Sequence, residues 1–245
     1  MFRKVLLALK MAVAAPTFLL FTIFMSFVFI VTMLLRLRGV AEAEIRLWSR
    51  LFLSIPPVKL EVEGREHVDP DQQYVFLANH LSNLDIPALF LAIPVPIRYL
   101  AKKEVYRIPI FAQALKMGGI VKIDRGAGAA TYQAINEGVA RAKERGYSLI
   151  IFAEGTRARG QDLAPFKKGA FRIAIMTGLP VVPVTINGTW EAWPPGSKLI
   201  YRHDAKIVID APIPTEGLDL TDIGDLRDQA RATINTRYQE LRAEG

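Results

Sequence analysis

Two residues five positions apart, His80 and Asp85, form the pair in this sequence that is best suited to acid–base chemistry. A neutral imidazole can take a proton from a hydroxyl group, while a carboxylate on its other ring nitrogen fixes the tautomer and stabilises the imidazolium that forms. The chain has no cysteine and no Gly-x-Ser-x-Gly sequence, so no nucleophile of either kind accompanies the pair. The base would therefore have to activate a hydroxyl group of the substrate itself.

The elements around this pair decide whether the two side chains can meet. The apolar run at residues 74–77 predicts a buried strand, and Pro87 favours a helix that begins within residues 83–86, because proline fits only the first turn of a helix. His80 would then lie in the turn before the helix and Asp85 at the helix start, where the two can approach each other. The alternative is purely structural: His80 caps the helix and Asp85 is solvated in its first turn.

A second group of candidates follows the predicted core strand at residues 148–152. The carboxyl ends of parallel strands surround the ligand crevice in open α/β sheets, so the turn after this strand should face the same crevice as His80. Its members are Glu154, Gly155, Thr156 and Arg157. Gly155 permits a sharp turn that brings backbone N–H groups close to an anion, although a structural pairing of Arg157 with Glu154 would explain the same residues.

Three further cations are candidates for binding an anionic substrate. Arg125 ends a predicted strand that begins at Ile120, and its guanidinium can pair with two phosphate oxygens at once. Lys102 follows a predicted strand at residues 97–101, and Lys168 lies at the start of a predicted helix. Lysines in such positions are more often simply solvated, so these two are supporting candidates.

The residue types give little support to metal or redox chemistry. With no cysteine and only three scattered histidines, the chain offers no disulfide and no zinc motif, and we expect neither a metal ion nor a cofactor. Gly126 and Gly128 follow a strand and precede a helix, which loosely imitates a dinucleotide-binding turn. The third glycine position holds Thr131, so a nicotinamide or flavin oxidoreductase is the weakest interpretation.

The net charge of +7 is concentrated beside the most apolar part of the chain. Residues 1–60 hold eight Lys and Arg residues against two Glu, whereas the remainder holds 23 basic and 22 acidic residues. Residues 11–35 carry no charge, and as a helix these 25 residues would be about 37 Å long, more than a hydrocarbon core of about 30 Å. The pattern predicts attachment to a membrane, by a helix that spans it or breaks near Pro16, rather than nucleic-acid binding.

The segment that follows predicts an amphipathic helix over residues 40–54, with Trp48 and Phe52 on its apolar face. Contact with lipid headgroups and packing against the globular domain would both produce this pattern. We therefore divide the chain into a membrane-associated helical segment, residues 1–55, and a globular domain, residues 56–245.

Strand and helix patterns alternate through the globular domain, which is typical of an α/β fold. One predicted strand, residues 181–186, contains Pro183. Proline cannot donate a ladder hydrogen bond, so it favours an edge or bulge position for this strand.

Four ordered blocks within about residues 56–215 resemble the glycerolipid acyltransferases of the lysophosphatidate acyltransferase type. The blocks lie at residues 79–85, which resemble the family's His-x4-Asp motif, and at residues 119–125, 152–157 and 182–184. The third block of the family usually reads Phe-Pro-Glu-Gly-Thr-Arg-Ser, whereas Ala153 and Ala158 replace the proline and the serine here. Lys122, in the second block, occupies a position that is commonly apolar.

The resemblance implies a mixed, largely parallel β-sheet covered by helices, with an N-terminal anchor in the inner membrane and an active site that faces the cytoplasm. His80, oriented by Asp85, would deprotonate the hydroxyl group of a lysophospholipid, and this group would attack the thioester of acyl-CoA or acyl-carrier protein. With 1-acyl-glycerol-3-phosphate as acceptor, the product would be phosphatidic acid, as in phospholipid biosynthesis. The residues that would hold the acceptor's phosphate are Arg125, Glu154, Gly155, Thr156 and Arg157, supported by Lys102 or Lys168.

Two alternatives to this acceptor and this chemistry stay open. The same mechanism would serve another lysolipid, such as a lyso-ornithine lipid. A non-catalytic lipid-binding membrane protein would keep the pocket without the chemistry, and would release no free thiol from acyl-CoA.

Overall fold

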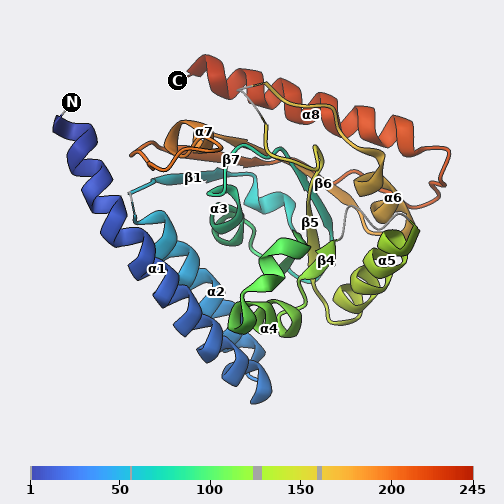
Figure 1. The fold of residues 1–245 in the computed structure, drawn as a ribbon. Coiled ribbons are helices and arrows are strands. Elements are labelled where there is room, and N and C mark those ends of the chain that lie inside the picture. Colours follow the sequence, from blue (N-terminus) through green and yellow to red (C-terminus); the bar gives the residue numbers. More distant parts are fainter. Residues whose placement is uncertain (1, 56, 124–128, 159–161, 245) are drawn as a thin grey trace.

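The computed structural model describes residues 2–55, 57–123, 129–158 and 162–244. In this part of the chain, the strands form one seven-stranded sheet with the order β1-β7-β6-β2-β5-β3-β4 (Figure 1). The strands are β1 (Leu60–Glu63), β2 (Val75–Ala78), β3 (Ile97–Lys102), β4 (Val121–Ile123), β5 (Ser148–Phe152), β6 (Val181–Asn187) and β7 (Ala205–Ile209). Neighbouring strands are parallel except for the antiparallel pair β6 and β7. The predicted mixed, largely parallel sheet is confirmed.

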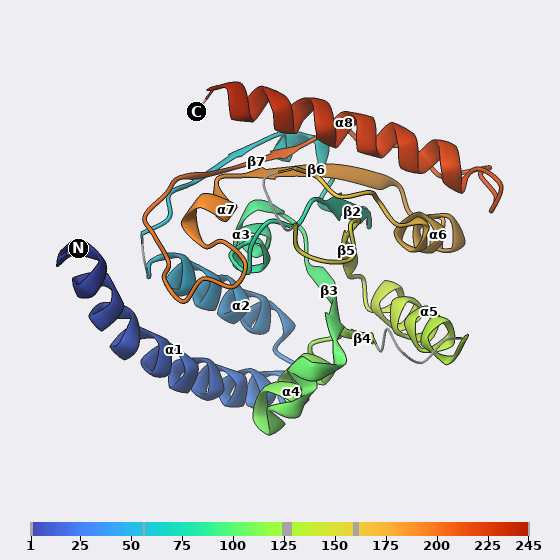
Figure 2. The ribbon, with the colours of Figure 1, turned by 45° about the horizontal axis from the view of Figure 1, so that its top comes forward.

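Helices cover both faces of this sheet. The α-helices are α1 (Phe2–Leu34), α2 (Arg38–Leu53), α3 (Asp85–Ala92), α4 (Pro109–Met117), α5 (Ala129–Glu144), α6 (Lys168–Thr177), α7 (Thr189–Ala192) and α8 (Ile223–Glu244). Two short 3-10 helices are η1 (Arg65–His67) and η2 (Lys103–Arg107). Figure 2 shows α8 lying across one face of the sheet, with α2 and α3 on the opposite side.

Strand β2 lies at the centre of the sheet and is buried on both faces, which explains its continuous apolar sequence. Phe76 and Ala78 pack in the cluster that includes residues of α2 and α3. Val75 and Leu77 point to the other face, where residues of α5, α6 and α8 complete a second cluster. The loop that carries His80 therefore leaves the sheet from the middle of the core.

Strand β6 is an interior strand, so the edge position predicted for Pro183 is wrong. The bulge alternative agrees with the pairing, because the register shifts by one residue across Pro183, from Val184 opposite Ile209 to Val181 opposite Ile213. The strand pairs with β2 on one side and with β7 on the other. The antiparallel ladder with β7 begins only at Val184, and the carbonyl of Pro183 accepts a bond from the N–H of Asp210 just outside it. The missing N–H of Pro183 points to the same side as its carbonyl, at the irregularity between the ladder that begins at Val184 and the pair of Val181 with Ile213, so the proline costs little there.

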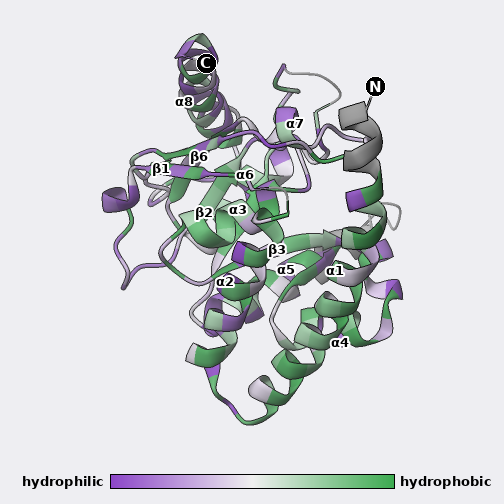
Figure 3. Ribbon diagram, turned by 90° about the vertical axis from the view of Figure 1, so that its left-hand side faces the viewer, coloured by the Kyte–Doolittle hydropathy of each residue, from purple (hydrophilic) through white to green (hydrophobic). Residues whose placement is uncertain are grey.

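Helix α1 continues through Pro16 without a break. Its segment Leu9–Leu34 is long and apolar enough to cross a membrane. The most apolar 18-residue stretch of this segment has a mean hydropathy of 2.4, and only 17% of that stretch is buried. Leu20, Phe24 and Phe27 are examples of large side chains on its exposed surface. The apolar surface of α1 is thus available for contact outside the protein. Figure 3 shows that most of α1 is coloured as hydrophobic.

Helix α2 packs its aromatic residues against α1. The indole N–H of Trp48 donates to the hydroxyl of Thr22 at 3.1 Å, and the ring of Phe52 lies 4.8 Å from that of Phe18. The hydroxyl of Thr32 donates to Glu44 at 2.7 Å. Of the two explanations of the amphipathic pattern, packing within the protein accounts for Trp48 and Phe52.

Candidate active site

The loop between β2 and α3 brings His80 and Asp85 together. Nδ1 of His80 lies 2.8 Å from Oδ2 of Asp85, which is hydrogen-bond distance. Helix α3 begins at Asp85, within the range predicted from Pro87, so the turn before it folds the imidazole back onto the carboxylate. The predicted approach of His80, in the turn, to Asp85, at the helix start, is confirmed. The catalytic role of the two residues stays a prediction.

The carboxylate of Asp85 is fully buried and both of its oxygens are bound. Oδ2 also accepts hydrogen bonds from the backbone N–H groups of Leu81 and Ser82, at 2.7 Å and 2.9 Å. Oδ1 accepts a bond of 2.6 Å from the hydroxyl of Thr189, at the start of α7. This network holds the carboxylate in one orientation, which a group that orients an imidazole requires.

The ring of His80 is held on a second side by an aromatic stack. It lies 3.7 Å from the ring of Phe152, at the end of β5, with 10° between the planes. Its side chain is 14% exposed, and in the described part of the chain nothing hydrogen-bonds Nε2. Nε2 is therefore the ring nitrogen left for a substrate hydroxyl group.

Glu154 joins the loops of the site through backbone hydrogen bonds. Its side chain is 1% exposed, and its two oxygens accept bonds of 2.9 Å from the N–H of His80 and 2.8 Å from the N–H of Ala164. Burial raises the pKa of Glu154, and the two backbone bonds and the nearby His80 partly oppose this rise. Glu154 and Arg157 are both described, and they form no salt bridge with each other. A structural pairing of Arg157 with Glu154 therefore does not explain the residues of this turn.

The turn after β5 contains one cation, Arg157, and two backbone N–H donors that bind no other residue in the described part of the chain. Gly155 has a φ of +70°, a conformation that favours glycine. Thr156 is exposed and Arg157 is half-buried. Neither the guanidinium of Arg157 nor the N–H groups of Thr156 and Arg157 bind another residue of the described ranges. The turn can therefore offer them to an anion.

The other predicted cations differ in their positions. Arg125 lies outside the described residues. Lys102 ends β3, which neighbours β5, so this exposed lysine lies at the same edge of the sheet as the His80 loop. Lys168 begins α6, and its charge reaches Asp228 of α8: the pKa of Asp228 is lowered mainly by its bond with Arg227, and Lys168 adds to the lowering.

Two residues that support the site were missed by sequence reasoning. Thr189 binds Asp85 although it lies 104 residues further along the sequence. The one sequence feature that could have indicated Thr189 is its position just after the carboxyl end of β6, where site residues tend to lie. Tyr238 of α8 packs with Leu81 and Ala158 in one buried cluster. Ala158 is 2% exposed, so this departure from the family's serine fills a packed position between the two loops.

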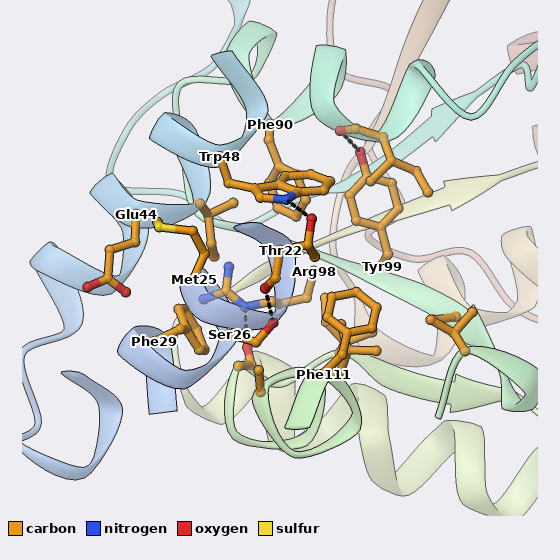
Figure 4. Close-up of a pocket in the computed structure, with 18 residues that line it drawn as sticks. Thr22, Met25, Ser26, Phe29, Glu44, Trp48, Phe90, Arg98, Tyr99 and Phe111 are labelled. Atoms are coloured by element: carbon orange, nitrogen blue, oxygen red, sulfur yellow. Dashed lines mark hydrogen bonds between the residues drawn. The ribbon is translucent and has the colours of Figure 1, made fainter. Parts of the chain in front are cut away.

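A cavity of about 250 Å³ lies between α1, α2, α4 and β3. Figure 4 shows its mostly apolar walls, which include Phe29, Trp48, Phe90, Tyr99 and Phe111. The ring of Tyr99 lies 5.8 Å from that of Phe152, which in turn stacks on His80. The cavity wall is therefore connected to the imidazole through one intervening aromatic ring.

The chain is similar to known acyltransferases. The chain is 35% identical over 191 residues to the chloroplastic 1-acyl-sn-glycerol-3-phosphate acyltransferase BAT2 of Brassica napus, covering 77% of this chain and 53% of that protein. It is 27% identical over 188 residues to the human 1-acyl-sn-glycerol-3-phosphate acyltransferase alpha, covering 77% of this chain and 66% of that protein. The chain thus spans about half to two thirds of the length of these curated relatives.

The fold is also that of a solved structure. The crystal structure of the 1-acyl-sn-glycerophosphate acyltransferase PlsC from Thermotoga maritima superposes with a TM-score of 0.83 at 24% identity, covering 99% of this chain and 97% of the other. A family model described as Acyltransferase matches residues 59–187, more than half of the sequence and the whole of the loops that carry His80 and Glu154. The chain therefore belongs to the Acyltransferase family.

Proposed function

We propose that this protein transfers a fatty acyl group from a thioester to the free hydroxyl group of a lysophospholipid, with 1-acyl-glycerol-3-phosphate as acceptor and phosphatidic acid as product. The observation that carries the proposal is the contact of 2.8 Å between His80 and a buried Asp85 whose other bonds fix its orientation. The names of the two curated relatives support this acceptor.

The reaction needs one proton to move twice. Nε2 of His80 takes the proton of the acceptor hydroxyl as its oxygen attacks the thioester carbonyl, and Asp85 stabilises the resulting imidazolium. The tetrahedral intermediate then breaks its carbon–sulfur bond, and the imidazolium returns the proton to the leaving thiolate. The new ester and a free thiol are the products, so no acyl-enzyme is formed.

The turn after β5 would bind the negative charges of the reaction, which are the acceptor's phosphate and the oxyanion of the tetrahedral intermediate. The N–H groups of His80, Leu81 and Ser82 are already bound to carboxylates, so they are not available to a substrate. The N–H groups of Thr156 and Arg157 and the guanidinium of Arg157 remain for the phosphate or the oxyanion. We infer that Glu154 positions this turn from behind, while Gly155 lets the backbone approach the anion.

Arg125 and Lys102 complete the proposed phosphate site. Both were predicted to follow strands β4 and β3, whose carboxyl ends lie at the same edge of the sheet as the Arg157 turn. Arg125 would bind two phosphate oxygens with its planar guanidinium. Lys102 would add a point charge, and Lys168 is the competing candidate from sequence.

The acyl chain of one substrate fits the cavity between the helices and β3. Its volume of about 250 Å³ and its aromatic walls suit a flexible hydrocarbon. The ring of Phe152 lies between Tyr99 of this wall and His80, so a chain in the cavity would have to pass that ring to bring its carbonyl end to the imidazole.

Membrane attachment through α1 supports a bilayer-borne acceptor. Besides α1, helix α2 exposes Val40, Leu47 and Leu51, and the segment before α4 exposes Ile108. These apolar side chains, together with the basic excess of the N-terminal residues, would seat the protein on an anionic leaflet. We place the active site on the cytoplasmic side, where thioester donors are available.

The test is thiol release from acyl-CoA or acyl-carrier protein in the presence of lysophosphatidate, comparing wild type with His80→Ala. We expect release that depends on the acceptor and falls by about 10²–10⁴-fold in the variant, the usual contribution of a general base. Equal rates would remove His80 as the base. Activity with a lyso-ornithine lipid but not with lysophosphatidate would change the acceptor and keep the mechanism, and no release with any lysolipid would leave a lipid-binding protein.

A further inference from the structure

The side chain of Lys167 lies over the Gly155 turn. A Cβ atom on Gly155 would be 3.0 Å from Cδ of Lys167 and 3.3 Å from its Cε and Nζ. The backbone N–H of Lys167 donates to the carbonyl of Ala153 at 2.8 Å, which fixes the start of the side chain beside the end of β5. The ammonium group is therefore held close to the turn by a stem of defined origin.

The positive charges at this turn have no counter-ion in the described ranges. Neither Lys167 nor Arg157 forms a salt bridge with a described residue. The carboxylate of Glu154 is occupied by the N–H groups of His80 and Ala164, and the first turn of α6 has no acidic residue. An anion bound at the turn would supply the counter-ion that both cations lack there.

The adjacent Lys168 is placed differently. Its charge contributes to the lowered pKa of Asp228, after the larger effect of the hydrogen bond from Arg227. Lys168 thus lies near enough to Asp228 of α8 to add a small effect on its pKa, whereas the side chain of Lys167 lies against the Gly155 turn. Two neighbouring lysines look alike in the sequence, and the backbone at the start of α6 turns them to different neighbours.

We propose that Lys167 binds the acceptor's phosphate together with Arg157, so that two cations from different elements hold the anion over Gly155. This inference rests on the proposed acyl transfer to a phosphate-bearing acceptor. A lysine supplies a point charge with three donors on a flexible stem, whereas an arginine also fixes orientation. Lys167 therefore adds affinity for the phosphate and takes no part in proton transfer at His80.

The experiment compares Lys167→Gln, Lys167→Arg and Lys168→Gln in the full chain, with lysophosphatidate dispersed in a neutral detergent. Arg172→Gln is the matched charge control, because this exposed arginine lies on α6 beyond the first turn. We expect Lys167→Gln to raise the KM for lysophosphatidate about tenfold, the effect of losing one charge-assisted bond, with kcat within twofold of wild type. Lys167→Arg should recover most of the lost affinity, and the KM of the acyl donor should not change.

Three results would overturn the proposal. The first is a rise of the acceptor KM in Lys168→Gln and not in Lys167→Gln, which would return the role to Lys168. The second is an equal rise in Lys167→Gln and Arg172→Gln, which would reduce the effect to net charge. The third is a rise of the donor KM in place of the acceptor KM, which would assign Lys167 to the phosphates of the donor.

A binding measurement separates this inference from the proposed function. Isothermal titration of lysophosphatidate into His80→Ala, with and without Lys167→Gln, reports affinity without turnover. A tenfold weaker Kd in the double variant supports phosphate binding by Lys167, whether or not wild type transfers an acyl group. Failure of wild type to transfer an acyl group would refute the proposed function alone. An unchanged Kd overturns the role of Lys167.

Discussion

Replacing Asp85 by asparagine removes one charge and leaves the shape of the site almost unchanged. Oδ2 accepts three hydrogen bonds, from Nδ1 of His80 and from the N–H groups of Leu81 and Ser82. An amide oxygen can take that place, and the amide N–H₂ can donate to Thr189, whose hydroxyl can accept as well as donate. We therefore expect Asp85→Asn to fold normally, whereas Asp85→Ala would leave two buried N–H groups unsatisfied at about 1–3 kcal/mol each.

The expected loss of activity follows from the charge. The carboxylate is within 2.8 Å of Nδ1, so the centres of the carboxylate and of the imidazolium formed on His80 are about 4 Å apart. At that distance, with an effective dielectric constant of about 20, the attraction is about 4 kcal/mol. Because Asp85→Asn loses this attraction only when the imidazolium forms, it should lower kcat by about three powers of ten.

The assay is the rate of thiol release with lysophosphatidate at saturating donor, together with thermal unfolding of wild type and variant. The expected result is a loss of about 10³-fold in kcat, a nearly unchanged acceptor KM and a similar Tm. A correctly folded Asp85→Asn that keeps more than about a tenth of wild-type kcat would refute the reasoning, because the carboxylate charge would then contribute less than about 1.4 kcal/mol.

Two further predictions concern the back of the site and the cavity. Burial raises the pKa of Glu154 above its ordinary value of 4.5, so the free energy of unfolding of wild type falls as pH rises through the pKa of Glu154. Residue 154 does not titrate in Glu154→Gln, so the Tm advantage of wild type over this variant should shrink from acid to neutral pH. An advantage that grows would contradict the direction of the shift. In Gly118→Ala the new Cβ would approach the carbonyl of Ala114 to 3.1 Å and the ring of Phe29 to 3.2 Å, and both Gly118 and Phe29 line the cavity. If the added methyl group and the displaced ring shorten the cavity, the KM for the longest donors should rise about tenfold relative to donors two carbons shorter, because two buried CH₂ groups are worth about 1.6 kcal/mol. The same KM change for every chain length would place the acyl chain elsewhere.

The central pair was predictable because its geometry is local. A buried strand, a short turn and a helix opened by Pro87 are all written within about a dozen residues, and together they bring His80 onto Asp85. The sheet type was likewise predictable from the apolar strands and from the family resemblance. In each case the information lies in neighbouring residues or in a motif of fixed spacing.

The partners of that pair were not predictable, because they depend on strand order. Thr189 reaches Asp85 only because β6 lies beside β2, and Tyr238 reaches Leu81 only because α8 crosses the sheet above both loops. No spacing along the chain encodes either contact. The position of Glu154 shows the same limit: the residue was identified, but the direction of its carboxylate is decided by the N–H groups of two other loops.

The N-terminal helices and the globular domain share a buried charge, and this bears on how the anchor relates to the chemistry. Arg98 of β3 is 1% exposed, donates to the carbonyls of Ile97 and Gly118, lies 3.7 Å above the ring of Tyr147 and pairs with Glu42 of α2. A buried guanidinium without its carboxylate is strongly unfavourable, so α2 supplies a counter-ion that the strand requires. The same strand carries Tyr99 of the cavity wall to the stack on Phe152 and His80. Helices α1 and α2 therefore also support the cavity proposed for the acyl chain, so displacing them should reduce acyl transfer as well as membrane attachment.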